Sequence, residues 1–413
     1  MAKVAQNLSV NLRPEAELLL CCARTRMDQA VADRVRRALK RTIDWNYVMQ
    51  RAAYHGMIPL LFQHLNHSFV NDVPKTVLDQ LRIFSNRITL QNLSLTGELL
   101  KLLKLFQQQG IRALPIKGPA LAVSAYGNLS LRQFGDLDIL VAKEDMLNAK
   151  AVLISQGYHP KLNLTVEQEA AYLTSQHDYA FLGCNDSVVV EIQWGITQRL
   201  FAFPFNFRDA WERRETIFIA GTPVFNLAPE ELLLTLCVHG TKHRWEQLKW
   251  ISDVAELAAA YRQKIDWDRI GSESRRLGGE RMLLLGLLLA HDLLGVELPG
   301  GTSERIHNDA QVKLLAGQVS KQLFYEVSSP TRLRDEAPFF YWQSRERLRD
   351  KLALLKKYVP EYFFRIVVPN KRDHAVVRLH SFLFITYYLI RPARLICEHW
   401  SSVRQRFYRK ESR

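Results

Sequence analysis

The chain has 413 residues, of which 47% are hydrophobic and 24% are charged, a composition typical of globular proteins. This length and composition exclude a disulfide-rich mini-protein, a collagen-like repeat and a low-complexity tail, and they predict two or three domains. The formal net charge of +14 is uneven, because residues 331–413 hold 19 Lys and Arg against 8 Asp and Glu, a net +11.

The first 110 residues are predicted to be helical, because apolar residues recur three and four positions apart. The expected helices are Glu15–Arg26, Asp28–Arg41, Trp45–Ala53, Pro59–Asn66 and a longer one, Asn86–Gln109. Gly110 supplies a stop after the last of them. We therefore assign residues 1–110 to an N-terminal helical region.

After Gly110 the pattern changes to short apolar runs of the kind that form strands. The expected strands are Arg112–Ile116, Leu137–Val141, Asp178–Leu182 and Ser187–Trp194. Ala120–Tyr126 and Glu144–Gln156 are expected helices, and the last two strands should pair as a hairpin. Residues 111–228 are therefore predicted to form a mixed α and β domain.

Helical spacing returns at Pro229, and the expected helices are Pro229–Gly240, Arg244–Tyr261 and Arg281–Leu294. Pro299–Ser303 is the best linker candidate. The sequence thus predicts a helical domain over residues 229–298 and a basic, aromatic-rich helical module over residues 304–413. The charge over residues 331–413 indicates an anionic partner such as nucleic acid, a phosphorylated substrate or a lipid surface, or else simply a solvated basic face.

The cysteine usage and hydropathy indicate the compartment. Five cysteines without a CxxC pair fit a reducing environment better than a disulfide framework or a zinc ribbon. Glu15 and Glu17 interrupt the early apolar run, so we expect no secretory signal. Met282–His291 and Leu379–Ile390, the strongly apolar uncharged stretches, are shorter than the roughly 20 residues needed to cross a bilayer. The sequence therefore predicts a cytoplasmic protein that is not transmembrane.

Two aspartates at the start of an expected strand carry the clearest chemical signal. Asp136 and Asp138 lie two positions apart, so both side chains project from the same face. Adjacent carboxylates repel each other unless a cation lies between them, and oxygen ligands suit Mg²⁺ or Mn²⁺. Glu191 is the lone acid in the apolar run Val188–Gln193, as expected of a third metal ligand or a general base.

Lys117-Gly118 follows the first expected strand, where glycine lets the backbone approach a phosphate and lysine adds a positive charge. Each of these signals also has an ordinary structural interpretation, such as turn aspartates or an acid on a water-facing edge strand. Their order along the chain is more specific than any one of them.

In that order the segment 111–158 resembles the uncharacterised nucleotidyltransferases of the DNA polymerase β-like superfamily, its fifth nucleotidyltransferase group. The matching residues are Lys117-Gly118, Tyr126, Arg132, Asp136-Leu137-Asp138, Ile139-Leu140-Val141 and Glu191-Ile192-Gln193-Trp194. The similarity extends over residues from about 40 to about 260 and fades over residues 300–413. The wider superfamily has a Gly-Ser pair in place of Lys117-Gly118 and an aspartate in place of Glu191.

The resemblance implies an α+β fold, in which a small mixed β-sheet nucleotidyltransferase core is embedded between N-terminal and C-terminal helical regions. It also implies a reaction in which an NTP loses pyrophosphate while its nucleoside monophosphate moves to an acceptor. The implied catalytic metal ligands, for Mg²⁺ or Mn²⁺, are Asp136, Asp138 and Glu191. The implied nucleotide-binding residues are Lys117, Gly118, Arg132, His239, His243 and Arg244.

The acceptor stays open between a small molecule, a sugar, a peptide, a protein and an RNA end. A rival interpretation is a non-catalytic nucleic-acid-binding protein on the same fold, led by the basic module. Steep salt dependence of RNA binding without NTP consumption would favour that rival. A third interpretation is a membrane-surface adaptor, with Leu379–Arg394 in the interface.

Overall fold

The computed structural model describes residues 12–183, 188–197, 203–324 and 338–355. The chain divides into two compact units, residues 1–350 and 351–413. The described residues of the second unit, 351–355, are helical. The predicted basic module over residues 304–413 lies largely outside the described residues, so its structure and the predicted domain boundaries stay predictions.

The N-terminal region is helical, as the apolar spacing predicts. Its helices are α2 (Pro14–Cys22), α3 (Gln29–Leu39), α4 (Trp45–His55), α5 (Ile58–Ser68) and α6 (Lys75–Gln108). Two of them begin at aspartates that cap the first turn: the Asp28 carboxylate accepts a hydrogen bond from the Val31 amide, and the Asp44 carboxylate accepts one from the Tyr47 amide.

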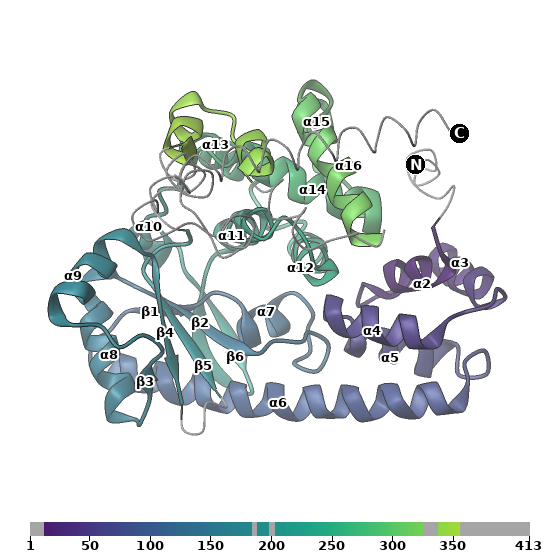
Figure 1. The fold of residues 1–413 in the computed structure, drawn as a ribbon, viewed down its shortest axis with the longest axis horizontal. Helices are drawn as coiled ribbons and strands as arrows, with labels where there is room; N and C mark the ends of the chain where they lie inside the picture. Colours follow the sequence, from purple (N-terminus) through teal and green to yellow (C-terminus); the bar gives the residue numbers. More distant parts are fainter. Residues whose placement is uncertain (1–11, 184–187, 198–202, 325–337, 356–413) are drawn as a thin grey trace, which may run out of the picture. The chain divides into compact units, whose positions relative to one another are not determined.

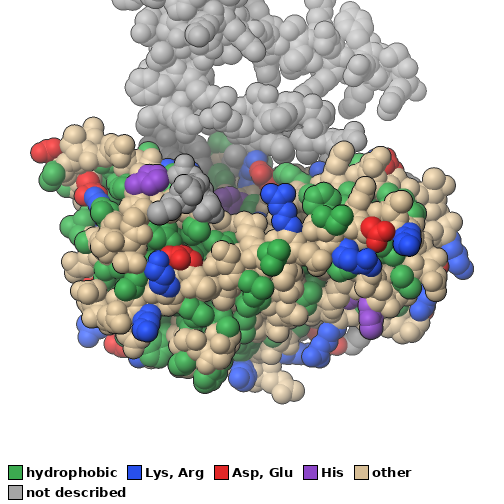
Figure 2. Space-filling view, turned by 90° about the horizontal axis from the view of Figure 1, so that it is seen from below, with side chains coloured by type: hydrophobic (Ala, Val, Ile, Leu, Met, Phe, Trp, Pro, Cys, Tyr) green, Lys and Arg blue, Asp and Glu red, His purple; other side chains and the backbone are tan. Residues whose placement is uncertain are grey.

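The long helix α6 begins at Lys75, well before the predicted Asn86, because Val77 and Leu81 are buried on the same side as Leu99. It runs under α5 and then along one face of the sheet (Figure 1). The face of the molecule seen from below carries small groups of hydrophobic side chains among charged ones (Figure 2). The length of α6 thus joins the N-terminal helices to the core domain.

A five-stranded mixed sheet forms the centre of the first unit. Its strands are β1 (Ala113–Pro115), β2 (Asp136–Val141), β3 (His159–Pro160), β4 (Asp178–Leu182) and β5 (Val189–Gln193), in the order β1-β2-β5-β4-β3. β2 and β5 are parallel, and the other neighbours are antiparallel, which includes the predicted β4–β5 hairpin. This sheet within helical regions is the predicted α+β fold.

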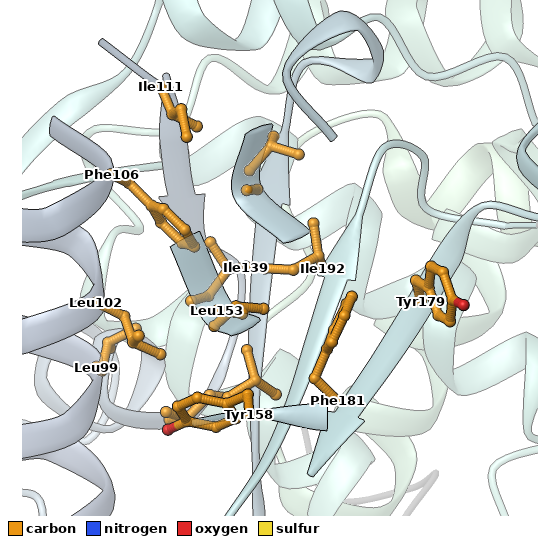
Figure 3. Close-up of a cluster of buried hydrophobic side chains, with 14 of the residues drawn as sticks. Leu99, Leu102, Phe106, Ile111, Ile139, Leu153, Tyr158, Tyr179, Phe181 and Ile192 are labelled. Atoms are coloured by element: carbon orange, nitrogen blue, oxygen red, sulfur yellow. The ribbon is translucent and has the colours of Figure 1, made fainter. Parts of the chain in front are cut away.

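One face of the sheet packs against α6 and against α8 (Met146–Ser155). Leu99, Leu102 and Phe106 of α6 meet Ile139 of β2 and Ile192 of β5 in this core (Figure 3). Because side chains alternate along a strand, the residues between these buried ones point to the opposite face of the sheet. That alternation fixes which face carries the acids.

Five helices and strands of the core domain were not predicted: the short strand β3, the helices α9 (Val166–Ser175) and α10 (Phe207–Glu212), and the strands β6 (Glu215–Ile219) and β7 (Thr222–Asn226), which form a second sheet. The two-residue turn of this hairpin is Ala220-Gly221, and both residues have positive φ, 49° and 79°. Its twist matches that of the flanking antiparallel strands. A short 3₁₀ turn, η1 (Lys143–Asp145), precedes α8.

The remaining described elements are helical. They are α7 (Gly118–Ser124), α11 (Pro229–Lys242), α12 (Leu248–Ala260), α13 (Trp267–Leu277), α14 (Glu280–Leu294), α15 (Thr302–Asn308) and α16 (Ala310–Phe324). The Leu-rich α14 is buried along most of its length and packs against α11, α12 and α16. Within the described part of the chain, no helix combines the length and apolar character needed to cross a membrane.

Candidate active site

A cleft with a volume of about 310 Å³ lies over the face of the sheet that is turned away from the α6 core. Its walls come from the turn before α7, the segment leading into β2, the strands β2, β4 and β5, and the helices α11 and α12. The predicted residues that line it are Lys117, Gly118, Arg132, Asp136, Asp138, Glu191, His239 and His243. The fold therefore brings together predicted residues that are up to 126 positions apart in the sequence, from Lys117 to His243.

The acids lie on two neighbouring parallel strands. β2 begins at Asp136, and Asp138 is directly opposite Glu191 in the register of β2 and β5. Leu137 and Ile139 point into the core, so the two aspartates share the cleft face, as alternation predicts. Burial, followed by the charge of Asp138, raises the pKa of Asp136, and burial followed by the charges of both aspartates raises the pKa of Glu191 to about 7. Burial and mutual repulsion therefore both disfavour the ionised forms of Asp136 and Glu191.

Lys117 is the cation nearest to these acids. Its Nζ lies 3.0 Å from Asp138 Oδ2 and 3.4 Å from His239 Nδ1. Gly118, the next residue, has a φ of 54°, a conformation that favours glycine and opens α7 directly beside the start of β2. This turn is what places the lysine over the acid cluster.

Gln193 lines the cleft, although it was not among the predicted site residues. Its Nε2 donates to Asp138 Oδ1 over 2.6 Å and lies 3.5 Å from Glu191 Oε2. The signal was present, because Gln193 is two positions after Glu191 on one strand and so shares its face. Together Gln193 and Lys117 engage both carboxylate oxygens of Asp138.

Arg132 lines the cleft, but its guanidinium is held by another buried residue. Its Nε and Nη2 donate to the two carboxylate oxygens of Asp253 at 2.7 and 2.9 Å, and the Tyr126 hydroxyl donates to the same Asp253 at 2.7 Å. Asn92 of α6 in turn donates to the Arg132 carbonyl over 2.9 Å. Arg132 is therefore fixed in the wall. Asp253, which holds it, lies on α12.

Two histidines and a tryptophan form an aromatic wall. The ring centroids of His239 and His243 are 4.6 Å apart, and that of Trp250 is 5.7 Å from the first and 5.1 Å from the second. Burial, followed by the charge of Lys117, holds the pKa of His239 well below its usual value. Burial, followed by the charge of Lys242, lowers the pKa of His243 to about 4. Both imidazoles are therefore neutral at pH 7.

Two further lysines, Lys242 and Lys249, complete the cationic side of the cleft. Lys242 lies one turn after His239 on α11, and its Nζ is 3.3 Å from His177 Nε2. The stem of Lys249 passes so close to Gly56 that a Cβ there would lie 2.9 Å from Lys249 Cδ. Burial lowers the pKa of both lysines. The end of α4 thus helps to position one of the cleft cations.

Arg244 lies elsewhere. The predicted helix Arg244–Tyr261 begins only at Leu248, and Arg244 stands in the preceding loop with a φ of 52° and an ion pair to Glu246. It is not among the residues that line the cleft. The loop forms because the buried ring of Trp245 packs on Gly240 and Gly286, where any Cβ would lie within 3.0 Å of it.

The comparison with protein families identifies the family to which this chain belongs. A family of uncharacterised nucleotidyltransferases matches residues 41–295. The chain belongs to this family. The match begins before α4, ends after α14, and contains every residue that lines the cleft, so the cleft lies in the part of the chain that defines this nucleotidyltransferase family. A search of the curated proteins found no match.

In a nucleotidyltransferase, the donor set of the acid cluster fits a hard divalent cation. Carboxylate oxygens are the ligands that Mg²⁺ and Mn²⁺ prefer, and a cation would offset the burial and the repulsion that raise the pKa values of Asp136 and Glu191. Among the described residues, no three His, Cys, Asp or Glu side chains already converge as ligands. Asp138 instead contacts Lys117 and Gln193, so an incoming cation competes with these two groups.

Proposed function

We propose that this nucleotidyltransferase moves a nucleoside monophosphate from an NTP to an acceptor, and that Asp136, Asp138 and Glu191 hold Mg²⁺ or Mn²⁺ for the reaction. The observation that carries the proposal is the acid cluster on β2 and β5, which faces half-buried lysines across one cleft. Two-metal sites of this kind stabilise the attacking and leaving oxygens of a phosphoryl displacement. The cations, when bound, supply that stabilisation and neutralise the carboxylates.

The side chains of the cleft account for the rest of the chemistry. The ammonium groups of Lys117, Lys242 and Lys249 neutralise the triphosphate, which carries its charge into a partly buried space. Glu191 would complete the metal site and take the proton of the attacking hydroxyl or amine. The acceptor atom then forms its bond to the α-phosphorus, the bond to the β-phosphate oxygen breaks, and pyrophosphate leaves with the electron pair.

The aromatic wall is proposed to bind the nucleotide base. Neutral His243 and Trp250 offer ring faces for stacking, and the neutral His239 holds Lys117 in place. Arg132 and the Gly118 turn are proposed to contribute positive charge and close backbone approach to the phosphates. Arg244 lies outside the cleft lining, and we propose no role for it in nucleotide binding.

The acceptor is proposed only as a nucleophile, whether a small molecule, a sugar, a peptide, a protein or an RNA end. The rival function, nucleic-acid binding without catalysis, depends on the basic segment 331–413, most of which lies outside the described residues. Any anionic partner of that segment stays a prediction, as does cytoplasmic localisation.

Transfer of label from the two ends of the triphosphate tests the proposal. The full chain is incubated with Mg²⁺, a cell extract and each NTP, labelled either at the α-phosphate or at the γ-phosphate. We expect the α-label to enter an acceptor and the γ-label to leave as pyrophosphate. Entry of the γ-label into an acceptor that the extract alone does not label indicates a kinase and contradicts the proposal. Salt-dependent RNA binding with no transfer of either label supports the rival function instead.

A further inference from the structure

A second and larger cavity, with a volume of about 890 Å³, lies at the opposite ends of two helices that also line the catalytic cleft. The first residues of α7 and α12, such as Gly118 and Lys249, line the cleft, whereas their last residues, such as Ser124 and Ala258, line the cavity. The other walls are the turn after α2 and the end of α14 with the loop that follows it. The helices α7 and α12 lie between the sheet and the N-terminal helices (Figure 1). No residue lines both spaces.

A buried polar network separates the two spaces. Tyr126 lines the cavity, and its hydroxyl donates to Asp253, the residue that holds Arg132 at the edge of the cleft. Asp253 is fully buried and Arg132 is 6% exposed. A molecule in the cavity is therefore kept apart from the acid cluster by these side chains.

Arg24 is the cation of the cavity lining that has a shielded donor without an acceptor. Its Nε is shielded from solvent without a hydrogen-bond partner, and no ion pair to its guanidinium occurs among the described residues. Arg262 pairs with Glu297, and Arg26 is an exposed cation of the lining. Glu256 accepts hydrogen bonds from the amide and hydroxyl of Thr25; burial raises its pKa, and these hydrogen bonds and the charge of Arg24 partly offset that rise. A donor that is shielded from solvent and lacks an acceptor is costly, and an anion in the cavity would supply the missing acceptor for Arg24 Nε.

The remaining wall is mostly apolar. Ala255 and Ala258 of α12, with Leu287 and Leu294 of α14, are buried side chains that line the cavity. The volume lies within the range of about 300–1,000 Å³ that is typical of small-molecule pockets. A ligand that matches both features has an acidic group and an apolar body.

We propose that this cavity is a second ligand site, which binds a small organic anion whose acidic group pairs with Arg24 and whose apolar part lies along α12 and α14. Carboxylates and phosphates share the chemistry that Arg24 recognises, since a guanidinium binds either in bidentate fashion. The proposal is independent of the transfer reaction.

Calorimetric titration of the full chain tests the site, with octanoate and octyl phosphate as the two acidic probes and octanol as the neutral one. We expect saturable binding of one molecule of at least one acidic probe per chain, and weaker binding of octanol. Arg24→Gln should raise the dissociation constant of the acidic probe by about tenfold or more, because a charge-assisted pair is lost. The matched control Arg36→Gln changes an exposed arginine of α3 outside the cavity and should leave the affinity unchanged.

A second variant keeps the test decisive if Arg24→Gln does not fold. Ala259 is an exposed alanine of the cavity lining, so Ala259→Trp should fill the space and weaken binding while the melting temperature stays that of the wild type. The proposal is overturned if neither acidic probe binds saturably, if octanol binds as tightly, or if the folded variants bind like the wild type. Loss of binding in Asp138→Asn would place the probe in the catalytic cleft and would also overturn it.

Discussion

The buried pair of Arg132 and Asp253 makes the sharpest structural prediction, because it joins the segment before β2 to α12. Asp253 is fully buried, its two oxygens accept hydrogen bonds from Arg132, and one of them also accepts the Tyr126 hydroxyl. Asp253→Asn keeps the shape of the side chain but removes its charge and turns an acceptor into a donor. The variant leaves the Arg132 guanidinium buried with a single acceptor.

Breaking a buried ion pair from one side costs about 3–5 kcal/mol. Unfolding entropy of about 2.1 cal/mol/K per residue gives roughly 0.7 kcal/mol per kelvin for a unit of about 350 residues. Asp253→Asn should therefore lower the melting temperature by about 4–7 °C. Thermal unfolding followed by circular dichroism measures the shift, and Asp268→Asn, an exposed change on α13, serves as the matched control.

The double variant Arg132→Met with Asp253→Leu separates loss of the pair from loss of packing. Because it removes both charges together, we expect it to be more stable than the sum of the single changes predicts. A melting temperature of Asp253→Asn within about 1 °C of the control, or strictly additive effects in the double variant, would refute the assigned role of this pair.

Three further predictions concern the cleft and its support. Glu191→Gln should slow transfer by about 10²-fold while NTP affinity, measured by equilibrium dialysis, is retained; wild-type transfer would show that the strand acid is structural. Trp250→Ala should raise the KM for the NTP by about tenfold or more through lost stacking, and an unchanged KM in steady-state kinetics would exclude the base from this wall. His55, whose Nδ1 accepts the Leu248 amide at the start of α12, has a pKa lowered to about 3, chiefly by burial. The stabilisation that neutral His55 provides is therefore complete above about pH 6.5 and falls as the pH drops toward 3. At pH 5 the free energy of unfolding should be about 2 kcal/mol lower than at neutral pH because of this group. His55→Gln should remove this part of the pH dependence in urea unfolding, and an identical pH profile would contradict the assignment.

The acid pair could be predicted from the sequence because local rules suffice for it. The buried residues Leu137 and Ile139 fix the core face of β2, and alternation then sends Asp136 and Asp138 to the other face. The same rule places Gln193 beside Glu191, although sequence reasoning did not apply it. The β6–β7 hairpin was equally accessible, since a two-residue turn ending in glycine separates two β-type runs.

Other features depend on contacts that no local pattern contains. Arg132 and Asp253 are 121 positions apart, so nothing in either segment indicates that they pair. The start of α12 was predicted too early because helical spacing continues through Trp245, and the ring of that residue instead leaves the helix to pack on Gly240 and Gly286. Tertiary packing overrides helix propensity at such positions.

The central claim, that the acids on β2 perform nucleotidyl transfer, is tested most directly by pyrophosphate release. The rate is measured with Mg²⁺, NTP and the acceptor-containing extract for the wild type, Asp136→Asn, Asp138→Asn and the control Asp79→Asn, which changes an exposed acid of α6. We predict that both β2 variants lose release, that the control keeps it, and that Asp136→Asn melts no lower than the wild type in metal-free buffer, because its charge is repelled by Asp138. Full release by either folded β2 variant would contradict the account.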